Sequence, residues 1–370
     1  MPSIFSEVTS KALAQYLDKR EYDKKYFQTF FPLKYTPWLD YETLIGEKAI
    51  AAASVVSYNS SAPESTRRTI KKLTGEIPAI RIKRILDEKK INEYNVLKAT
   101  IKATGDMTAL LDIVYNDTDF VVNSILERME WLALKALTQF EISLTIDNNA
   151  RGIVTEEVID FGLESTHKKV CTAADQYWDN TNILTNDPIA DIVRVCSEAR
   201  QSGIKIRYIV MNASKFVDFK NSAAVKNYIY GVMITSAGLT PSTPPTLELI
   251  NKMMTESGLP KIVVIDEYIQ VEDIDHNFSG LDPLENAAGD DKLVTFLADL
   301  EMGSFLFGPI AAETNPLKDV EQHKVGNILV QVFGESDPVR QFTVGLTNCW
   351  PSYNRIDEAW SLNTESHVNW

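Results

Sequence analysis

The sequence contains few of the residues that carry covalent or metal chemistry. Its only cysteines are Cys171, Cys196 and Cys349, which stand far apart in a chain of 370 residues. An odd number of thiols cannot be paired completely into disulfides, and the spacing does not match that of zinc ligands. We therefore expect buried free thiols, which behave in a protein core as small apolar side chains.

Catalytic motifs are also missing. The sequence has no glycine-rich phosphate loop and no serine elbow. Asp290, Asp291 and Asp337 could bind a metal or act as acid and base, but acidic residues are commoner in turns. We expect no catalytic residue, no cofactor and no metal, although triads can assemble from distant positions. The four histidines have no partner at metal-ligand or nucleophile-activating spacing; they are His167, His276, His323 and His367.

Long hydrophobic runs do not occur. A membrane helix would need about 18 or more consecutive apolar residues, and the first 18 residues lack the basic, apolar and small order of a secretion signal. With 44% hydrophobic and 24% charged residues, the chain can bury a substantial core in one large or two intermediate domains. We expect a soluble protein that is made in a cytoplasm and has no membrane partner.

Positive charge is scarce. The chain has 37 Lys and Arg against 51 Asp and Glu, which gives a formal net charge of -14. Proteins that grip nucleic acid obtain their affinity from clustered cations that release counterions from phosphates. A dedicated nucleic-acid reader is therefore disfavoured.

Aromatic residues are concentrated in the first 45 residues. Pro32 and Pro37 interrupt them, which is typical of an extended arm whose side chains pack against something else. Two interpretations stay open: the aromatics pack in their own subunit, or they contact a neighbouring subunit, where aromatics are enriched. The candidates for intersubunit contact are Phe27, Phe30, Phe31 and Trp38.

A basic segment follows. Between Ala62 and Lys90 there are nine basic and four acidic residues, and residues 77–85 alternate between apolar and polar. This pattern indicates two strands of a projecting hairpin, or a charged face in solvent. The basic residues whose role depends on this choice are Arg67, Arg68, Lys71, Lys72, Arg81, Lys83 and Arg84.

The strongest helical pattern covers residues 119–140. Asn116, Asp117 and Thr118 precede it as a capping run, and one apolar stripe continues to Phe140. About 22 residues at a rise of 1.5 Å form a rod of roughly 33 Å. Two short strands around a turn at 147–149 are expected after this spine helix.

From residue 187 helices and strands alternate. Asp187 and Pro188 form a helix start, and Asn212 begins another helix directly after a strand at 206–211. A further helix near Leu247 and a strand at 262–265 complete a predicted α/β unit over 165–320. The tail is expected to add strands at 327–333 and 339–346.

The order of these motifs resembles a known family. Residues 125–138, ILERMEWLALKALT, are followed by the strand segment VIDFG at 158–162, and both are similar to the spine helix and next strands of the lambda-type phage major capsid protein E family. The family's order is kept by Trp178 before the 186–188 helix start, by IRYIVM at 206–211 with Asn212, and by SDPV at 336–339 before Trp350 and Pro351. One difference is that Gln139, Phe140 and Glu141 stand where the family usually has a Gly-Lys pair; the chain also continues past Trp350 to Trp370.

The resemblance implies an α+β protein with the Hong Kong phage capsid fold. Its expected parts are an N-terminal arm (1–45), an extended hairpin loop (46–92), a peripheral domain with the spine helix (93–164), an axial α/β domain (165–320) and C-terminal strands that return to the peripheral domain (321–370). With the basic segment in the place of that loop, an intersubunit role becomes the favoured interpretation.

The implied function is that of a non-enzymatic major capsid protein. It would form hexamers and pentamers of an icosahedral shell in the virion head, with scaffolding and portal proteins, packaged double-stranded DNA and a decoration protein as further expected partners. A mildly acidic inner wall would let DNA slide. The alternatives are the shell protein of a cellular nanocompartment, which would enclose protein cargo, and an enzyme with a convergent polar pocket.

Overall fold

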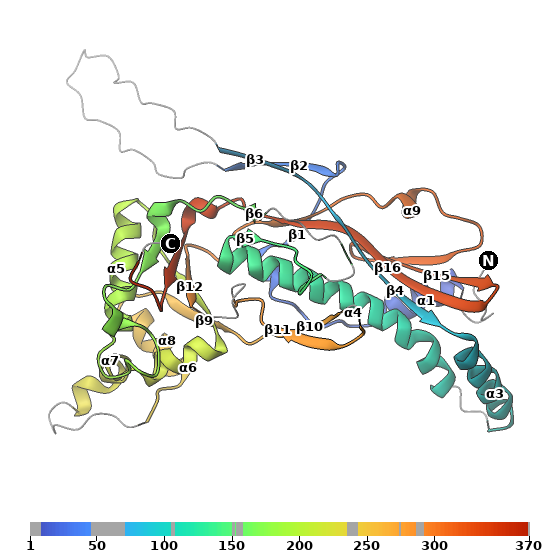
Figure 1. The fold of residues 1–370 in the computed structure, drawn as a ribbon, viewed down its shortest axis with the longest axis horizontal. Coiled ribbons are helices and arrows are strands. Elements are labelled where there is room, and N and C mark those ends of the chain that lie inside the picture. The colour runs from blue at the N-terminus through green and yellow to red at the C-terminus, as the bar shows by residue number, and fades with distance from the viewer. Residues whose placement is uncertain are drawn as a thin grey trace, which may run out of the picture. The chain divides into compact units, whose positions relative to one another are not determined.

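The computed structural model describes residues 9–45, 71–104, 108–149, 152, 158–234, 243–273, 275–285 and 292–368 (Figure 1). The chain forms two compact units, each built from separated segments. The first unit comprises Met1–Glu42, Thr74–Leu132 and Ser304–Ser352. The second comprises Thr43–Leu73, Ala133–Gly303 and Tyr353–Trp370.

The first unit is organised around a six-stranded sheet. Its strand order is β1-β13-β16-β15-β14, and β4 pairs with β16. β15 and β16 form a long antiparallel ribbon, drawn in red in Figure 1, because strong apolar alternation continues on both sides of the turn at Asp337. The strands are β1 (Leu33–Tyr35), β4 (Ala79–Leu86), β13 (Ser304–Phe307), β14 (Glu321–Val325), β15 (Ile328–Ser336) and β16 (Val339–Ser352).

The spine helix is confirmed, but its predicted start was wrong. The helix α4 spans Thr108–Gln139, so the predicted capping run lies inside it. Thr118 is buried, and the Asp117 carboxylate pairs with Arg84 at 3.3 Å. These polar side chains serve tertiary contacts, which a capping rule based on neighbouring residues does not foresee.

A glycine lets the spine helix lie close to the sheet. A Cβ atom on Gly345 of β16 would come within 2.9 Å of Ile125 Cδ1 and 3.1 Å of the Val121 carbonyl oxygen. Such distances are far below ordinary van der Waals contact, so any side chain there would push the helix off the strand. Gly345 therefore sets the helix-to-sheet distance in the first unit.

The strand predicted at 77–85 is confirmed as β4, for which the sequence indicated no particular partner; the projecting hairpin loop stays a prediction. β4 pairs antiparallel with β16 along its whole length. The two-stranded pairing near the basic segment instead joins β2 (Asp40–Ile45) and β3 (Lys71–Glu76). Alternation in a sequence shows that a strand has two different faces, but not which distant strand completes its hydrogen bonds.

The helices α1 to α4 contribute to the first unit, which also contains the short helix α9 (Ala311–Thr314). Thr9 caps α1, because its hydroxyl accepts a hydrogen bond from the Ala12 N–H at 3.2 Å. Leu13 and Leu17 are buried on the face of α1 that lies against β14. Besides α4, the helices are α1 (Ser10–Leu17), α2 (Phe27–Phe30) and α3 (Glu88–Thr104).

The second unit is an α/β layer structure. Its mixed sheet has the strand order β7-β17-β12-β8-β9. The sheet and the helices α5, α6, α7 and α8 share one apolar core, and the helices lie around β9 and β12 in Figure 1. The strands are β7 (Lys168–Val170), β8 (Tyr208–Asn212), β9 (Lys261–Ile265), β12 (Leu293–Leu297) and β17 (Ala359–Asn363). The helices are α5 (Pro188–Gln201), α6 (Ala213–Asn221), α7 (Ala223–Ile234) and α8 (Leu247–Glu256).

Several local predictions for this unit are confirmed. The Asp187 carboxylate accepts from the Ala190 N–H at 3.0 Å and caps α5, while Asn212 caps α6 through the Lys215 N–H at 2.8 Å. Helix α7 was not predicted. The strand β17 also differs from expectation, because residues 321–370 were expected to return together and β17 instead pairs with β12 and β7.

The remaining elements are short. The predicted strands after the spine helix are confirmed as β5 (Glu141–Ile142) and β6 (Ile159–Asp160), each only two residues long. The others are β10 (Ile269–Glu272), β11 (Phe278–Leu281), α9 (Ala311–Thr314), and three 3-10 turns at Ser165–His167, Ala174–Gln176 and Ile356–Glu358.

Phe140 ends the spine helix in an unusual conformation. Its φ is 59°, in the left-handed region where glycine is favoured. The strain costs on the order of 1 to 3 kcal/mol. The ring is buried against Tyr353 at a centroid distance of 5.8 Å, and loss of a buried phenylalanine costs about 3 to 5 kcal/mol. Burial therefore outweighs the strain.

Candidate functional site

The arm aromatics fall into two groups. Phe27, Phe30 and Phe31 are 0%, 1% and 0% exposed in the single chain. The prediction that these three lose exposure by contact with a neighbouring subunit was therefore wrong, and the interpretation that they pack in their own subunit holds. The reason is that the arm folds back within its own chain: in the first unit, the Phe27 ring lies edge-on to the Phe305 ring at a centroid distance of 5.5 Å.

One buried carboxylate holds this part of the arm. Glu130 of α4 is 0% exposed, and its Oε1 and Oε2 accept hydrogen bonds from the Tyr26 and Phe27 N–H groups at 2.8 and 2.7 Å. These N–H groups stand at the start of α2, where they have no partner within the helix. A charged acceptor makes such bonds strong. The clamp therefore fixes the arm at the point where its phenylalanines enter the core.

A second carboxylate holds the preceding segment. Asp119 accepts from the Tyr16 and Tyr22 hydroxyls at 2.6 and 3.3 Å and pairs with Arg20 at 3.3 Å. Tyr16 also stacks on Tyr115 at a centroid distance of 4.2 Å. Burial, followed by the charge of Asp119, raises the pKa of Tyr22. The tyrosine therefore stays a neutral donor to this carboxylate.

Beyond the clamp the arm presents apolar side chains to solvent. Trp38 is 75% exposed and Tyr35 is 56% exposed, with Leu33 and Leu39 at about two fifths. We call these four residues the arm patch. β1, which carries Leu33 and Tyr35, pairs in parallel with β13. Exposed apolar groups clustered on one short segment are a mark of an interaction surface.

The basic candidates are only partly visible. Arg67 and Arg68 lie outside the described residues, and for Lys71 and Lys72 the structure describes the backbone of β3 alone. Arg81 and Lys83 are exposed on β4, and the Lys83 ammonium lies 4.9 Å from the centre of the Phe342 ring.

Arg84 is engaged inside its own unit. Its guanidinium pairs with Asp117 and lies over the Phe120 ring at 4.1 Å. Burial raises the pKa of the Asp117 carboxyl, while the charge of Arg84 opposes that rise. Of the basic candidates on β4, Arg81 and Lys83 thus remain exposed for contacts with another molecule.

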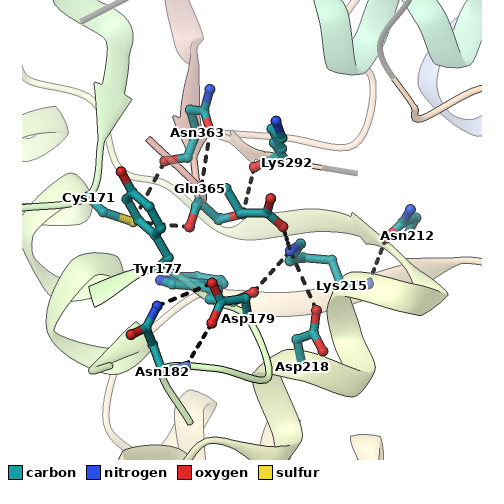
Figure 2. A network of polar contacts seen from close by, with 12 residues as sticks. Cys171, Tyr177, Asp179, Asn182, Asn212, Lys215, Asp218, Lys292, Asn363 and Glu365 are labelled. Carbon is teal, nitrogen blue, oxygen red and sulfur yellow. Dashed lines mark hydrogen bonds and ion pairs between the residues drawn. The ribbon is translucent and has the colours of Figure 1, made fainter. Parts of the chain in front are cut away.

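Two cations of the second unit, one buried and one partly buried, were missed by sequence reasoning. Lys215 is fully buried, and its Nζ lies 2.7 Å from Glu365 Oε1, 3.5 Å from Asp218 Oδ2 and 3.0 Å from the Trp178 carbonyl oxygen. Figure 2 shows the lysine pointing between the two carboxylates. The Glu365 partner is 150 residues away, so no local pattern could indicate the pair.

Lys135 is the partly buried cation. Its ammonium donates to the Glu285 carbonyl oxygen, and the Gln139 amide donates to the Leu284 carbonyl oxygen at 2.9 Å. Burial lowers the pKa of Lys135 to about 8, and the nearby carboxylates of Asp282, Glu285 and Glu141 oppose that shift. The last turns of α4 are therefore tied to the segment 282–285 by side chains of the helix.

The described residues offer little chemistry of other kinds. Within them, no group of three or more His, Cys, Asp or Glu side chains is placed to hold a metal ion. Among the same residues, no helix combines the length and the apolar character that crossing a membrane requires. The three cysteines are buried and free, as predicted, and burial raises the pKa of Cys196 to about 11 and of Cys171 and Cys349 to about 12.

Residues 40–248, more than half of the sequence, match the family described as phage major capsid protein E. The chain belongs to this family. The predicted resemblance is therefore confirmed, and the protein is a major capsid protein, a structural subunit of the phage head shell.

Two solved structures of similar fold cover nearly the whole capsid protein. One is a protein assigned as the capsid protein of a prophage from E. coli CFT073, with a TM-score of 0.54, 14% identity, and coverage of 96% of this chain and 99% of that one. The other is a phage-related protein from Bordetella bronchiseptica RB50, with a TM-score of 0.54, 11% identity, and coverage of 97% and 98%. The predicted α+β capsid fold is confirmed. No curated protein sequence matches significantly. The five-part division of the chain stays a prediction.

Glu130→Ala in the capsid protein should release the arm. It leaves two buried N–H groups without their acceptor, at about 1 to 3 kcal/mol each. We expect a loss of roughly 2 to 5 kcal/mol in the free energy of unfolding, and fast hydrogen exchange at the Tyr26 and Phe27 amides. Glu127→Ala is the matched control, because Glu127 lies on the same helix and pairs with Lys25 of the arm while 36% exposed; it should cost under about 1 kcal/mol. Unchanged exchange at Phe27 in Glu130→Ala would disprove the clamp.

Lys135 should make the stability of the unassembled subunit depend on pH in the alkaline range. Its pKa is about 8 in the folded protein, against an ordinary value of 10.5, so between these values the unfolded chain holds more protons at this site. The free energy of unfolding should therefore gain a contribution that rises with pH across this window. Denaturation of wild type and Lys135→Met at several pH values between 7.5 and 10 measures it: the difference between the two should change across the range. If the unfolding free energies of the two proteins ran parallel against pH, burial would not lower the pKa of Lys135 in the folded protein.

Proposed function

We propose that this major capsid protein self-assembles into hexamers and pentamers that close an icosahedral shell around a double-stranded DNA genome. Assembly in the bacterial host cytoplasm with scaffolding and portal proteins, and a decoration protein on the finished head, belong to the same proposal. The subunit needs no cofactor and carries no enzymatic activity in this role. The DNA is enclosed without sequence specificity, and the net charge of -14 gives the chain no general attraction for phosphates that would fix the DNA to the wall.

The arm patch is the observation that carries the proposal. It sits directly after a segment that the Glu130 clamp holds against the body, so its position is fixed before any neighbour arrives. An apolar surface that is already ordered loses little conformational entropy when it binds. Trp38, the most exposed large aromatic of the patch, is the natural anchor.

Charge gives the second contribution. Arg67, Arg68, Lys71, Lys72, Arg81 and Lys83 belong to a basic segment within an anionic chain. Such a subunit is self-complementary, since the basic segment of one copy can lie across an acidic surface of the next and repeat around a ring. Single exposed pairs are worth about 0.2 to 1 kcal/mol, so the effect depends on many repeats.

Trp38→Ser tests the arm patch. Because the side chain is 75% exposed, the variant should unfold within about 0.5 kcal/mol of wild type, yet form shells poorly in electron micrographs. Leu184→Ser is the matched control, since Leu184 is 84% exposed but lies outside the patch; it should assemble normally. Full shell yield from Trp38→Ser would contradict the role of the patch.

Reversal of Arg67, Arg68, Lys71 and Lys72 to Glu tests the charge contribution. Assembly should stop while the helical content measured by circular dichroism stays unchanged, and high salt should weaken assembly of the wild type in the same direction. Exchanging each Arg for Lys and each Lys for Arg keeps the charge and should preserve shells. Normal empty shells that package DNA poorly would place these residues at the lumen instead. Shells that enclose protein cargo and no DNA would favour a nanocompartment.

A further inference from the structure

The strand β17 has an interior place in a sheet whose other members are made earlier in the chain. It lies between β7 and β12, pairing with β12 from Ala359 to Asn363 and with β7 from Ser361 to Asn363. Trp360 and Leu362, at 1% and 0% exposure, belong to the apolar core of the second unit. Without β17, neither β7 nor β12 would have its sheet partner on that side.

The residues after β17 continue the attachment. The Trp178 N–H donates to the Thr364 carbonyl at 2.9 Å, the Cys171 N–H donates to the Ser366 carbonyl at 2.8 Å, and the Thr364 N–H donates to the Lys292 carbonyl at 2.7 Å. We call residues 359–368 the clasp. It joins segments that are separated from it by about 70 to 190 residues of sequence.

Glu365 of the clasp also neutralises a charge in the core. It forms the shorter of the two ion pairs of Lys215, at 2.7 Å against 3.5 Å for Asp218. The lysine side chain is fully buried, whereas that of Glu365 is 27% exposed (Figure 2). Removal of one partner from a buried pair is strongly destabilising because the other charge stays in the core, but replacement of both by apolar groups is often neutral. Removal of Glu365 should therefore destabilise the second unit more than removal of Lys215, since Glu365 without Lys215 can still reach water.

We propose that docking of the clasp, with Glu365 on Lys215, is the step that completes the fold of the α/β unit. This step makes the chain competent for assembly. Because synthesis runs from the N-terminus, the clasp is the last described segment to be made. A nascent chain that lacks the clasp therefore holds an open sheet, and its Lys215 lacks the shorter of its two ion pairs. Incomplete chains are thereby kept out of growing shells. The part that concerns assembly rests on the proposed function.

Substitutions at Glu365 and Lys215 in the full-length chain test this proposal. Glu365→Leu should raise the unfolding equilibrium constant of the second unit by at least about tenfold and remove the hydrogen-exchange protection of β8 and β12. Shell yield should fall in parallel. Glu365→Leu combined with Lys215→Met should return protection and yield to within about threefold of wild type. Lys215→Met alone should have an effect of about threefold or less.

Asp218→Leu is the matched control, because Asp218 makes the longer ion pair to the same lysine from the same helix. It should cost clearly less than Glu365→Leu. Wild-type protection in Glu365→Leu, or no rescue by Lys215→Met, would overturn the charge-coupled closure. Lost protection with full shell yield would overturn the link to assembly. Failure of the wild type to form any shell would count against the proposed function, while the exchange measurements would still decide whether the clasp closes the unit.

Discussion

The Glu130 carboxylate determines where residues 26–39 of the arm can lie. The helix α2 has four residues and is too short to be stable alone, so its start must be held by something outside it. Two N–H groups bound to one buried charge do this, and they orient the segment so that Phe27, Phe30 and Phe31 enter the core. The chain then leaves along β1 with Tyr35 and Trp38 turned to solvent. Burial of one part of the arm and exposure of the next follow from the same anchor.

Local signals predicted much of the second unit. Asp187 and Asn212 cap α5 and α6 as their residue types indicate, because a cap requires only the next three residues to be helical. The strands β8 and β9 follow from short apolar runs. The spine helix was equally clear, although its first turns were missed, because Asp117 and Thr118 have the residue types of caps but serve contacts with other parts of the first unit.

Pairings over long sequence distances could not be predicted from the chain. The alternation at 77–85 indicated a strand, but its partner β16 begins more than 250 residues later. The position of β17 inside the sheet of the second unit likewise depends on pairing with a strand that is distant in the sequence. The arm aromatics show why the candidate site could not be predicted from the sequence. Phe27 and Trp38 have similar apolar surfaces, and only the place of Glu130 on a distant helix separates the buried one from the exposed one.

Burial of the three thiols, two in the second unit and one in the first, protects the particle against oxidation of its cysteines. Cys171, Cys196 and Cys349 are at most 2% exposed, and burial keeps each of them protonated near neutral pH. Oxidants and disulfides react with the thiolate, and only where they can reach it. The three cysteines thus stay free thiols in reducing and in oxygenated surroundings alike. A head shell built from this capsid protein can therefore pass from one kind of surroundings to the other with its cysteines unchanged.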